Sequence, residues 1–150
     1  MSIGDFRLEY KGESSTIADV DVYDIAIKNV DKSFNTTVRV YHMTGWDGDS
    51  SVPKNSSVLL QLMELVDSRR KSDDTKTTVV MCRDGYSQSG LFCCISNARD
   101  QMKCDEEVDI YQISRQLLVR RPEVLTNFDQ YLYCYNTIKD YLDTTDIYVN

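Results

Sequence analysis

The chain has 150 residues, of which 41% are hydrophobic and 27% are charged, as is usual for a globular domain. Its net charge of −7 argues against non-specific binding to nucleic acid, which relies on clustered lysine and arginine. No apolar run is long enough to cross a bilayer and no signal-peptide segment opens the chain, so we expect a cytoplasmic segment without membrane contact.

The first third of the chain has the pattern of β-strands. Phe6–Tyr10 is a short strand-like piece, and Thr16–Val30 alternates between two faces for the length of a strand. Asn29–Asn35 supplies a turn, and Thr36–Met43 alternates again. These segments predict an antiparallel hairpin or meander.

A loop and a helix are expected next. Thr44–Pro53 is rich in residues that break regular structure. Ser56–Arg70 carries apolar residues at helical spacing, with Asn55 or Ser56 as the N-cap. The inward residues of this amphipathic helix are Val58, Leu59, Leu62, Leu65 and Val66.

The middle of the chain predicts a strand, a polar loop and a helix. Thr77–Met81 is β-branched and apolar and contains no breaker, which indicates a buried strand. The compact loop that follows leads into Leu91–Ala98, an apolar segment with the length and content of a helix.

Two further helices complete the prediction. Glu106–Arg120 should end at Arg121-Pro122, because the residue before a proline is pushed out of helical geometry. Its expected inward residues are Val108, Ile110, Tyr111, Ile113, Leu117 and Leu118. Asn127–Asp143 should form the last helix, with Phe128, Tyr131 and Tyr135 on its inner face. This order of strands and helices indicates an α/β chain of the α+β type.

The cysteines indicate a reduced protein. Five scattered cysteines with no Cys-x-x-Cys spacing do not form a disulfide framework. We expect Cys93, Cys94, Cys104 and Cys134 to be core residues. The one histidine, His42, has no cluster of ligands around it, so no metal and no cofactor are expected.

The remaining cysteine begins the polar loop. Cys82 follows the predicted strand, and the loop of residues 82–90 runs into a helix N-terminus. First-turn N–H groups have no partners within their helix, and the helix dipole adds positive potential, so such a loop favours anions. Cys82 is therefore a candidate thiolate nucleophile.

The loop Cys82-Arg83-Asp84-Gly85-Tyr86-Ser87-Gln88-Ser89-Gly90 resembles the phosphate-binding loop of protein-tyrosine phosphatases. That loop reads His-Cys, five residues, Arg, then Ser or Thr and Gly. Met81 stands at the histidine and Gln88 at the arginine. This variant is most similar to the inactive second, membrane-distal domain of receptor tyrosine phosphatases such as leukocyte common antigen.

Two further segments carry the same resemblance. Residues 38–46 are similar to the strand that leads to the family's mobile acid loop, with Trp46 at its tryptophan. Arg120-Arg121-Pro122, followed by Asp129-Gln130-Tyr131, is similar to the motif that positions the hydrolytic water. The resemblance covers only about the C-terminal half of the family's domain, so residues 1–150 are expected to form a partial domain.

The sequence departs from the family pattern at three functional positions. Gln88 replaces the arginine that would grip the phosphoryl group. Gly48 stands where the acid belongs, with Asp47 and Asp49 as displaced carboxylates. Thr126 replaces the first of two water-positioning glutamines, and Gln130 matches the second.

These departures predict a pseudophosphatase: an inactive regulatory or interaction module with residual phosphate or phosphotyrosine binding at residues 82–90. Its expected partner is a protein, either an active phosphatase domain or a phosphotyrosine protein. One alternative is a weakly active phosphatase that uses Cys82 with Asp47 or Asp49. Another is a redox-sensing thiol at Cys82.

Overall fold

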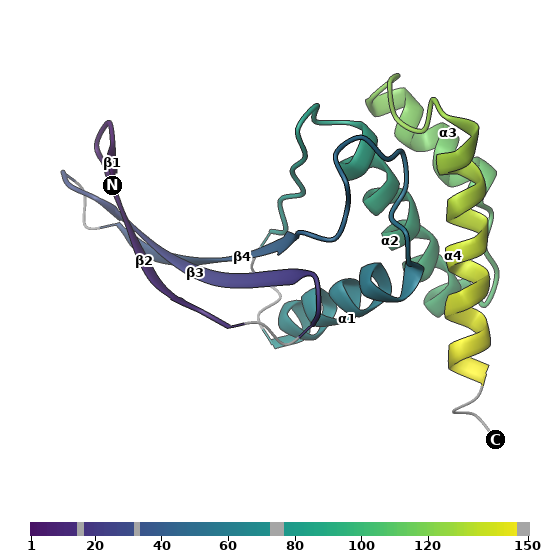
Figure 1. The fold of residues 1–150 in the computed structure, drawn as a ribbon, viewed down its shortest axis with the longest axis horizontal. Helices are drawn as coiled ribbons and strands as arrows, with labels where there is room; N and C mark the ends of the chain where they lie inside the picture. The colour runs from purple at the N-terminus through teal and green to yellow at the C-terminus, as the bar shows by residue number, and fades with distance from the viewer. Residues whose placement is uncertain (15–16, 32–33, 73–76, 147–150) are drawn as a thin grey trace. The chain divides into compact units, whose positions relative to one another are not determined.

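The computed structural model describes residues 1–14, 17–31, 34–72 and 77–146. They fall into two compact units, Met1–Trp46 and Asp47–Asn150. The first unit holds all the strands and the second holds all the helices of the described chain (Figure 1). This composition confirms the predicted α/β class.

The first unit is a four-stranded antiparallel sheet with its strands in chain order, as the meander prediction required. Figure 1 shows β2, β3 and β4 as long, curved neighbouring strands. The strands are β1 (Ser2–Ile3), β2 (Phe6–Glu13), β3 (Val20–Asn29) and β4 (Asn35–Met43). β3 begins at Val20, whereas the prediction began at Thr16, which lies outside the described residues; directly before Val20, Asp19 adopts a left-handed turn conformation with a φ of 62°.

An ion pair across β3 and β4 matches their register. Asp24 lies directly opposite Arg39, whose Nε and Nη2 donate to the two carboxylate oxygens at 2.8 and 2.7 Å. This two-pronged contact suits the planar fork of a guanidinium. Along β3, Val20, Val22 and Ala26 are buried, as the alternation of the sequence predicts for one face of a strand.

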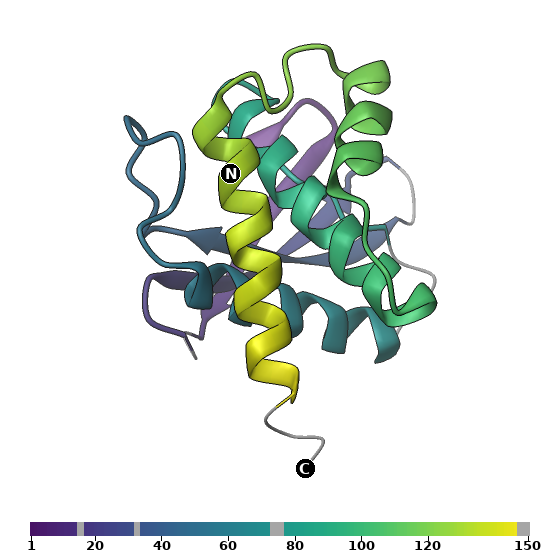
Figure 2. The same ribbon diagram turned by 90° about the vertical axis from the view of Figure 1, so that its right-hand side faces the viewer.

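The second unit consists of α1 (Ser56–Ser72), α2 (Ser87–Asp105), α3 (Ile110–Arg120) and α4 (Phe128–Asp146). In Figure 2, α4 crosses in front of α1 and α2, and α3 lies beside α2; each of these pairs is in contact. The fully or nearly buried apolar residues of these helices are Leu59, Leu60, Leu62, Met63, Leu91, Cys94, Ile95, Ala98, Ile110, Ile113, Cys134 and Ile138. Within the described ranges, no helix is both long enough and apolar enough to cross a membrane.

Side-chain caps begin α1 and α3. Asn55 is the N-cap of α1, since its Oδ1 accepts a hydrogen bond from Ser57 N–H at 2.9 Å. Asp109 accepts from Gln112 N–H at 3.0 Å and begins α3. The predicted start of this helix at Glu106 was wrong, because Glu106 is the left-handed residue that ends α2.

The predicted buried strand Thr77–Met81 was also wrong. These residues form no strand, and the side chains of Val79 and Met81 are 76% and 85% exposed. A strand needs neighbours that accept and donate its backbone hydrogen bonds. The only sheet in the described part of the chain consists of β1–β4, and Thr77–Met81 is not part of it.

Several residues expected in the core lie at the surface instead. On α3, Tyr111 and Leu118 are exposed, and on α4, Phe128 and Tyr135 are exposed. The buried face of α4 is formed by Gln130, Cys134, Thr137 and Ile138. Two of these are polar, so the hydrophobic pattern selected the wrong face of the helix. Cys104, expected in the core, is exposed at the end of α2, and Cys93 is half-buried.

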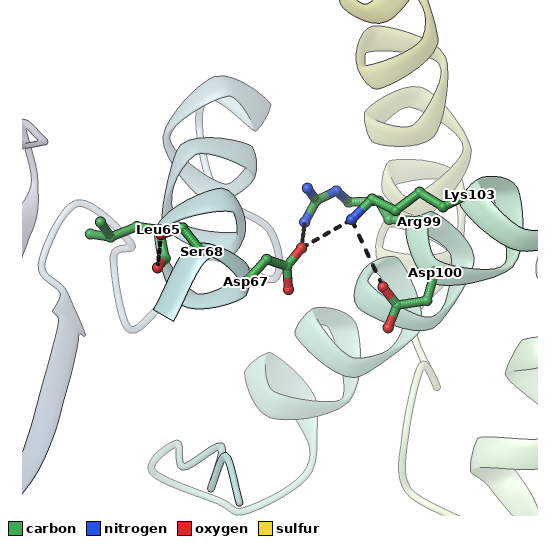
Figure 3. Close-up of polar contacts among 6 residues, drawn as sticks. All are labelled: Leu65, Asp67, Ser68, Arg99, Asp100 and Lys103. Atoms are coloured by element: carbon green, nitrogen blue, oxygen red, sulfur yellow. Dashed lines mark hydrogen bonds and ion pairs between the residues drawn. The ribbon is translucent and has the colours of Figure 1, made fainter. Parts of the chain in front are cut away.

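A buried cation connects α1 and α2. Asp67 of α1 points toward Arg99 and Lys103 of α2 (Figure 3). Asp67 Oδ2 lies 3.4 Å from Arg99 Nη1 and 3.1 Å from Lys103 Nζ. The Arg99 side chain is only 3% exposed, and its guanidinium also lies 5.0 Å from the centre of the Tyr141 ring. Asp67 is therefore the anion on which the buried charge depends.

Replacing Asp67 by asparagine should destabilise the fold by about 3 kcal/mol, because it leaves the Arg99 charge buried without a counter-ion. Urea unfolding measures this loss. The matched control is Lys103→Gln, which removes a cation that is 40% exposed and should cost less than about 1 kcal/mol. Equal losses in the two variants would contradict this account.

Candidate functional site

The loop of residues 82–90 turns sharply before α2. Residues 83–86 form bends, and Gly85 adopts a φ of +79°, which glycine reaches without steric cost. Gly90 N–H donates to the carbonyl of Tyr86 at 2.8 Å, and α2 begins at Ser87. Gln88 and Ser89 therefore belong to the first turn of the helix.

Cys82 is half-buried and contacts two side chains of the loop. Its Sγ lies 3.1 Å from Asp84 Oδ1 and 3.2 Å from Ser89 Oγ. The thiol donates to the Asp84 carboxylate, so the candidate nucleophile has a negatively charged neighbour. The sequence predicted a cysteine beneath helix N–H groups but not this carboxylate.

Asp84 binds the donors at the N-terminus of α2. Its Oδ1 accepts from Tyr86 N–H and Ser87 N–H, both at 3.0 Å, and its Oδ2 accepts from the Ser87 hydroxyl. The Ser87 hydroxyl, together with the Tyr86 N–H group, holds the pKa of Asp84 far below its usual value. Asp84 is also exposed, and both its exposure and these hydrogen bonds favour the ionised form of its carboxylate.

Two arginines lie near the loop, and one of them extends toward the predicted acid loop. A Cβ placed on Gly48 would lie 3.9 Å from Arg83 Nη1, and one placed on Gly85 would lie 3.7 Å from Arg121 Nη1. The Arg83 side chain thus reaches toward residue 48, where the family places its acid. Neither arginine stands at position 88, where the family pattern has its arginine.

The displaced carboxylates lie on an exposed turn. Asp47 Oδ1 accepts from Asp49 N–H at 3.2 Å, and the Asp47 carbonyl accepts from Ser50 N–H at 3.0 Å. The Asp47 side chain thus stabilises its own turn.

The predicted water-positioning glutamine is buried. Gln130 is 4% exposed, and its Nε2 donates to the carbonyl of Ser51 at 3.2 Å. Gln130 therefore connects α4 to the predicted acid loop. Thr126, at the other water-positioning site, is exposed. The catalytic roles assigned to these residues from the sequence remain predictions.

A close contact behind the loop was missed at the sequence level. A Cβ on Gly90 would lie 2.7 and 2.9 Å from the two methyl carbons of Val124. Val124 is buried and follows Arg121-Pro122. The loop pattern requires glycine at position 90, which was a sequence signal for a close contact there. The spacing of residues could not identify Val124 as the contacting residue.

Metal ligation is not a feature of the described part of the chain. No three side chains of histidine, cysteine, aspartate or glutamate are grouped there in a way that could hold a metal ion.

A cysteine-headed loop that runs directly into a helix N-terminus is the arrangement of a cysteine-dependent phosphatase domain. The family model described as protein-tyrosine phosphatase matches residues 1–140. The chain belongs to the protein-tyrosine phosphatase family, which confirms the resemblance found from the loop.

The similar proteins include receptor-type phosphatases. A receptor-type tyrosine-protein phosphatase of Caenorhabditis elegans is 39% identical over 113 residues, covering 74% of this chain and 8% of that protein. The human receptor-type tyrosine-protein phosphatase alpha is 24% identical over 150 residues, covering all of this chain and 18% of that protein. The human receptor-type tyrosine-protein phosphatase C is 27% identical, covering 87% of this chain and 12% of that protein. The chain thus spans a small part of these relatives.

The close contact at Gly90 leads to a stability prediction. Gly90→Ala should destabilise the protein by about 1–3 kcal/mol through overpacking against Val124, although alanine is the better helix former. Urea unfolding of Gly90→Ala, Val124→Ala and the double variant measures the coupling. The double variant should recover part of the loss. Additive losses would show that the two residues do not clash.

The Asp84 contacts lead to a prediction about pH. The pKa of Asp84 is lowered in the folded state from an ordinary value of 3.8, so its stabilising effect is complete above that value. As the pH falls below 3.8, the unfolded chain binds a proton that the native carboxylate resists, and the effect diminishes. Asp84→Asn should therefore lower the urea midpoint more at pH 7 than at pH 3.

The control for this pH effect is Ser87→Ala, which keeps the Asp84 carboxylate but removes the hydroxyl that does most to lower its pKa. In the Ser87→Ala background, the Asp84→Asn loss should depend less on pH. A loss that is the same at pH 7 and pH 3 in the wild-type background would contradict the assignment.

Proposed function

We propose that this chain is a catalytically inactive protein-tyrosine-phosphatase-like domain, a pseudophosphatase, that acts as a regulatory or interaction module. The observation that carries the proposal is Gln88, which occupies the first turn of α2 where the family pattern has arginine. Three further features of the site support it.

Gln88 cannot do the chemistry of an arginine. Arginine grips two phosphoryl oxygens with a charged planar fork and holds them as charge develops in the transition state. The glutamine amide is neutral, donates at most two hydrogen bonds and presents a carbonyl that repels phosphate oxygens. By analogy with arginine fingers, losing this charge costs on the order of 10³–10⁵ in rate.

The surroundings of Cys82 also favour inactivity. An attacking thiolate requires positive potential, whereas Cys82 Sγ contacts the carboxylate of Asp84. Arg83, the adjacent cation, extends toward Gly48.

The acid and the water-positioning groups are weakened as well. Gly48 has no side chain to protonate a leaving phenolate, and the Asp47 side chain accepts the Asp49 N–H group. The Gln130 amide nitrogen donates to the Ser51 carbonyl. Phosphoryl binding, leaving-group protonation and water positioning thus each lack at least one of the family's groups, at Gln88, Gly48 and Thr126.

An interaction module needs a contact surface, and the helices of the second unit offer exposed apolar residues for one. On α4, Phe128, Leu132 and Tyr135 recur at helical spacing, with exposed fractions of 72%, 45% and 45%. Exposed apolar side chains grouped in this way favour protein contacts. The proposed partner is an active phosphatase domain or a phosphotyrosine protein in the cytoplasm.

Phosphate release from a phosphotyrosyl peptide tests inactivity directly. The wild-type chain should release no phosphate above the level of Cys82→Ser, with circular dichroism showing that both are folded. Gln88→Arg should also remain silent or nearly so, because the acid-loop aspartate and the first water-positioning glutamine are still absent. Wild-type turnover that disappears in Cys82→Ser would overturn the proposal in favour of the weakly active phosphatase.

A pull-down with an active receptor phosphatase domain tests the interaction role. Wild-type chain should be retained, and Phe128→Ser with Leu132→Ser should weaken retention about tenfold or more, because both remove exposed apolar contact area. The matched control is Val119→Ser, which changes an 83% exposed side chain on α3. No retention of the wild-type chain would count against this partner.

A further inference from the structure

The N-terminus of α2 already holds an anion, and that anion is part of the chain. Asp84 Oδ1 accepts both the Tyr86 and the Ser87 N–H groups, each at 3.0 Å, and Asp84 Oδ2 accepts the Ser87 hydroxyl. These are donors that the start of the helix would offer to an external oxyanion. Each of the two carboxylate oxygens therefore contacts the loop in the manner of a phosphoryl oxygen.

An external phosphate would have to overcome two costs at this position. It would have to displace the Asp84 carboxylate from the Tyr86 and Ser87 N–H groups, and it would bring a second negative charge close to the first. Gln88 supplies no positive charge to offset this repulsion, and the nearby cations Arg83 and Arg121 extend toward Gly48 and Gly85 instead of standing at position 88. The sulfur of Cys82 lies 3.1 Å from the same carboxylate, so a phosphoryl group beside that sulfur would also lie close to the Asp84 charge.

We propose that the Asp84 carboxylate is an intramolecular occupant of the phosphate-binding loop and excludes external phosphoryl groups from it. This inference rests on the proposed function and deepens it: the loop keeps an anion-binding backbone but reserves it for its own side chain. Phosphate or phosphotyrosine enters only when Asp84 is withdrawn or removed. Asp84 is then the residue that regulates access to the site.

Titration with inorganic phosphate, followed through the backbone amide NMR signals of Tyr86 and Ser87, tests this proposal. Wild-type chain should show no saturable shift of these two signals in the millimolar range. Asp84→Ala should show a saturable shift, with phosphate bound roughly tenfold more tightly or better, which corresponds to one removed repulsion of about 1.4 kcal/mol. The matched control is Asp47→Ala, which removes an equal charge from the neighbouring turn and should behave like wild type.

Asp84→Ala also removes a helix-capping group, so a second variant controls for that loss. Asp84→Ser keeps a short oxygen that accepts the same N–H groups but carries no charge, so it should bind phosphate more tightly than the wild-type chain and less tightly than Asp84→Ala. Folded Asp84 variants whose affinity for phosphate is no higher than that of the wild-type chain would overturn the proposal. Failure of the pseudophosphatase proposal is seen separately, as wild-type phosphate release from a phosphotyrosyl peptide.

Discussion

The position of α2 depends on one steric constraint, the absence of a side chain at Gly90. Val124 packs against the Gly90 backbone more closely than any Cβ would allow. This contact holds the first turn of α2 against the segment that follows α3, while Asp67 and Arg99 hold α2 to α1 further along. These two contacts fix α2 at its first turn and further along the helix. The loop of residues 82–90 leads into this fixed helix, so the N–H groups at the start of α2 point in a set direction.

The chemistry of the loop follows from which charged groups lie at the N-terminus of α2. A helix N-terminus favours negative charge whether that charge comes from a ligand or from the chain itself. Here Asp84 provides it, and Gln88 adds no cation that would favour a more highly charged guest. The family's scaffold for phosphate is thus retained together with a neutral first turn and an internal carboxylate. These two features are the basis on which we propose a role in partner binding instead of catalysis.

Much of the fold was predictable because local rules governed it. The strands β2–β4 alternate regularly, and α1 combines an Asn55 cap with apolar residues at helical spacing, so each pattern had one interpretation. The loop was recognised because its pattern of Cys82, Ser89 and Gly90 is specific. The predictions that were wrong concern features that depend on residues close in space but distant in the sequence. The pattern of Thr77–Met81 is that of a strand, but a strand exists only beside another, and the inner face of α4 is partly polar because Gln130 and Thr137 pack inside.

The Asp84 contacts could not be predicted from the sequence for a similar reason. Spacing placed an aspartate in the loop, but whether its side chain points to solvent or back to the helix depends on the turn at Gly85. The burial of Gln130 likewise depends on where Ser51 lies, 79 residues away in the chain. Such long-range pairs leave no periodic signal.

The exposed segment Thr77–Met81 has a consequence for how the chain behaves at high concentration. It is a run of β-prone residues without charge or proline, and the side chains of Val79 and Met81 face the solvent. Segments of this kind template the growth of ordered aggregates when they meet copies of themselves. Lys76 and Arg83 stand close to either end of the run, and charges so placed oppose stacking in register. The solubility of the chain therefore depends on charge carried beside this run as well as on the folded core.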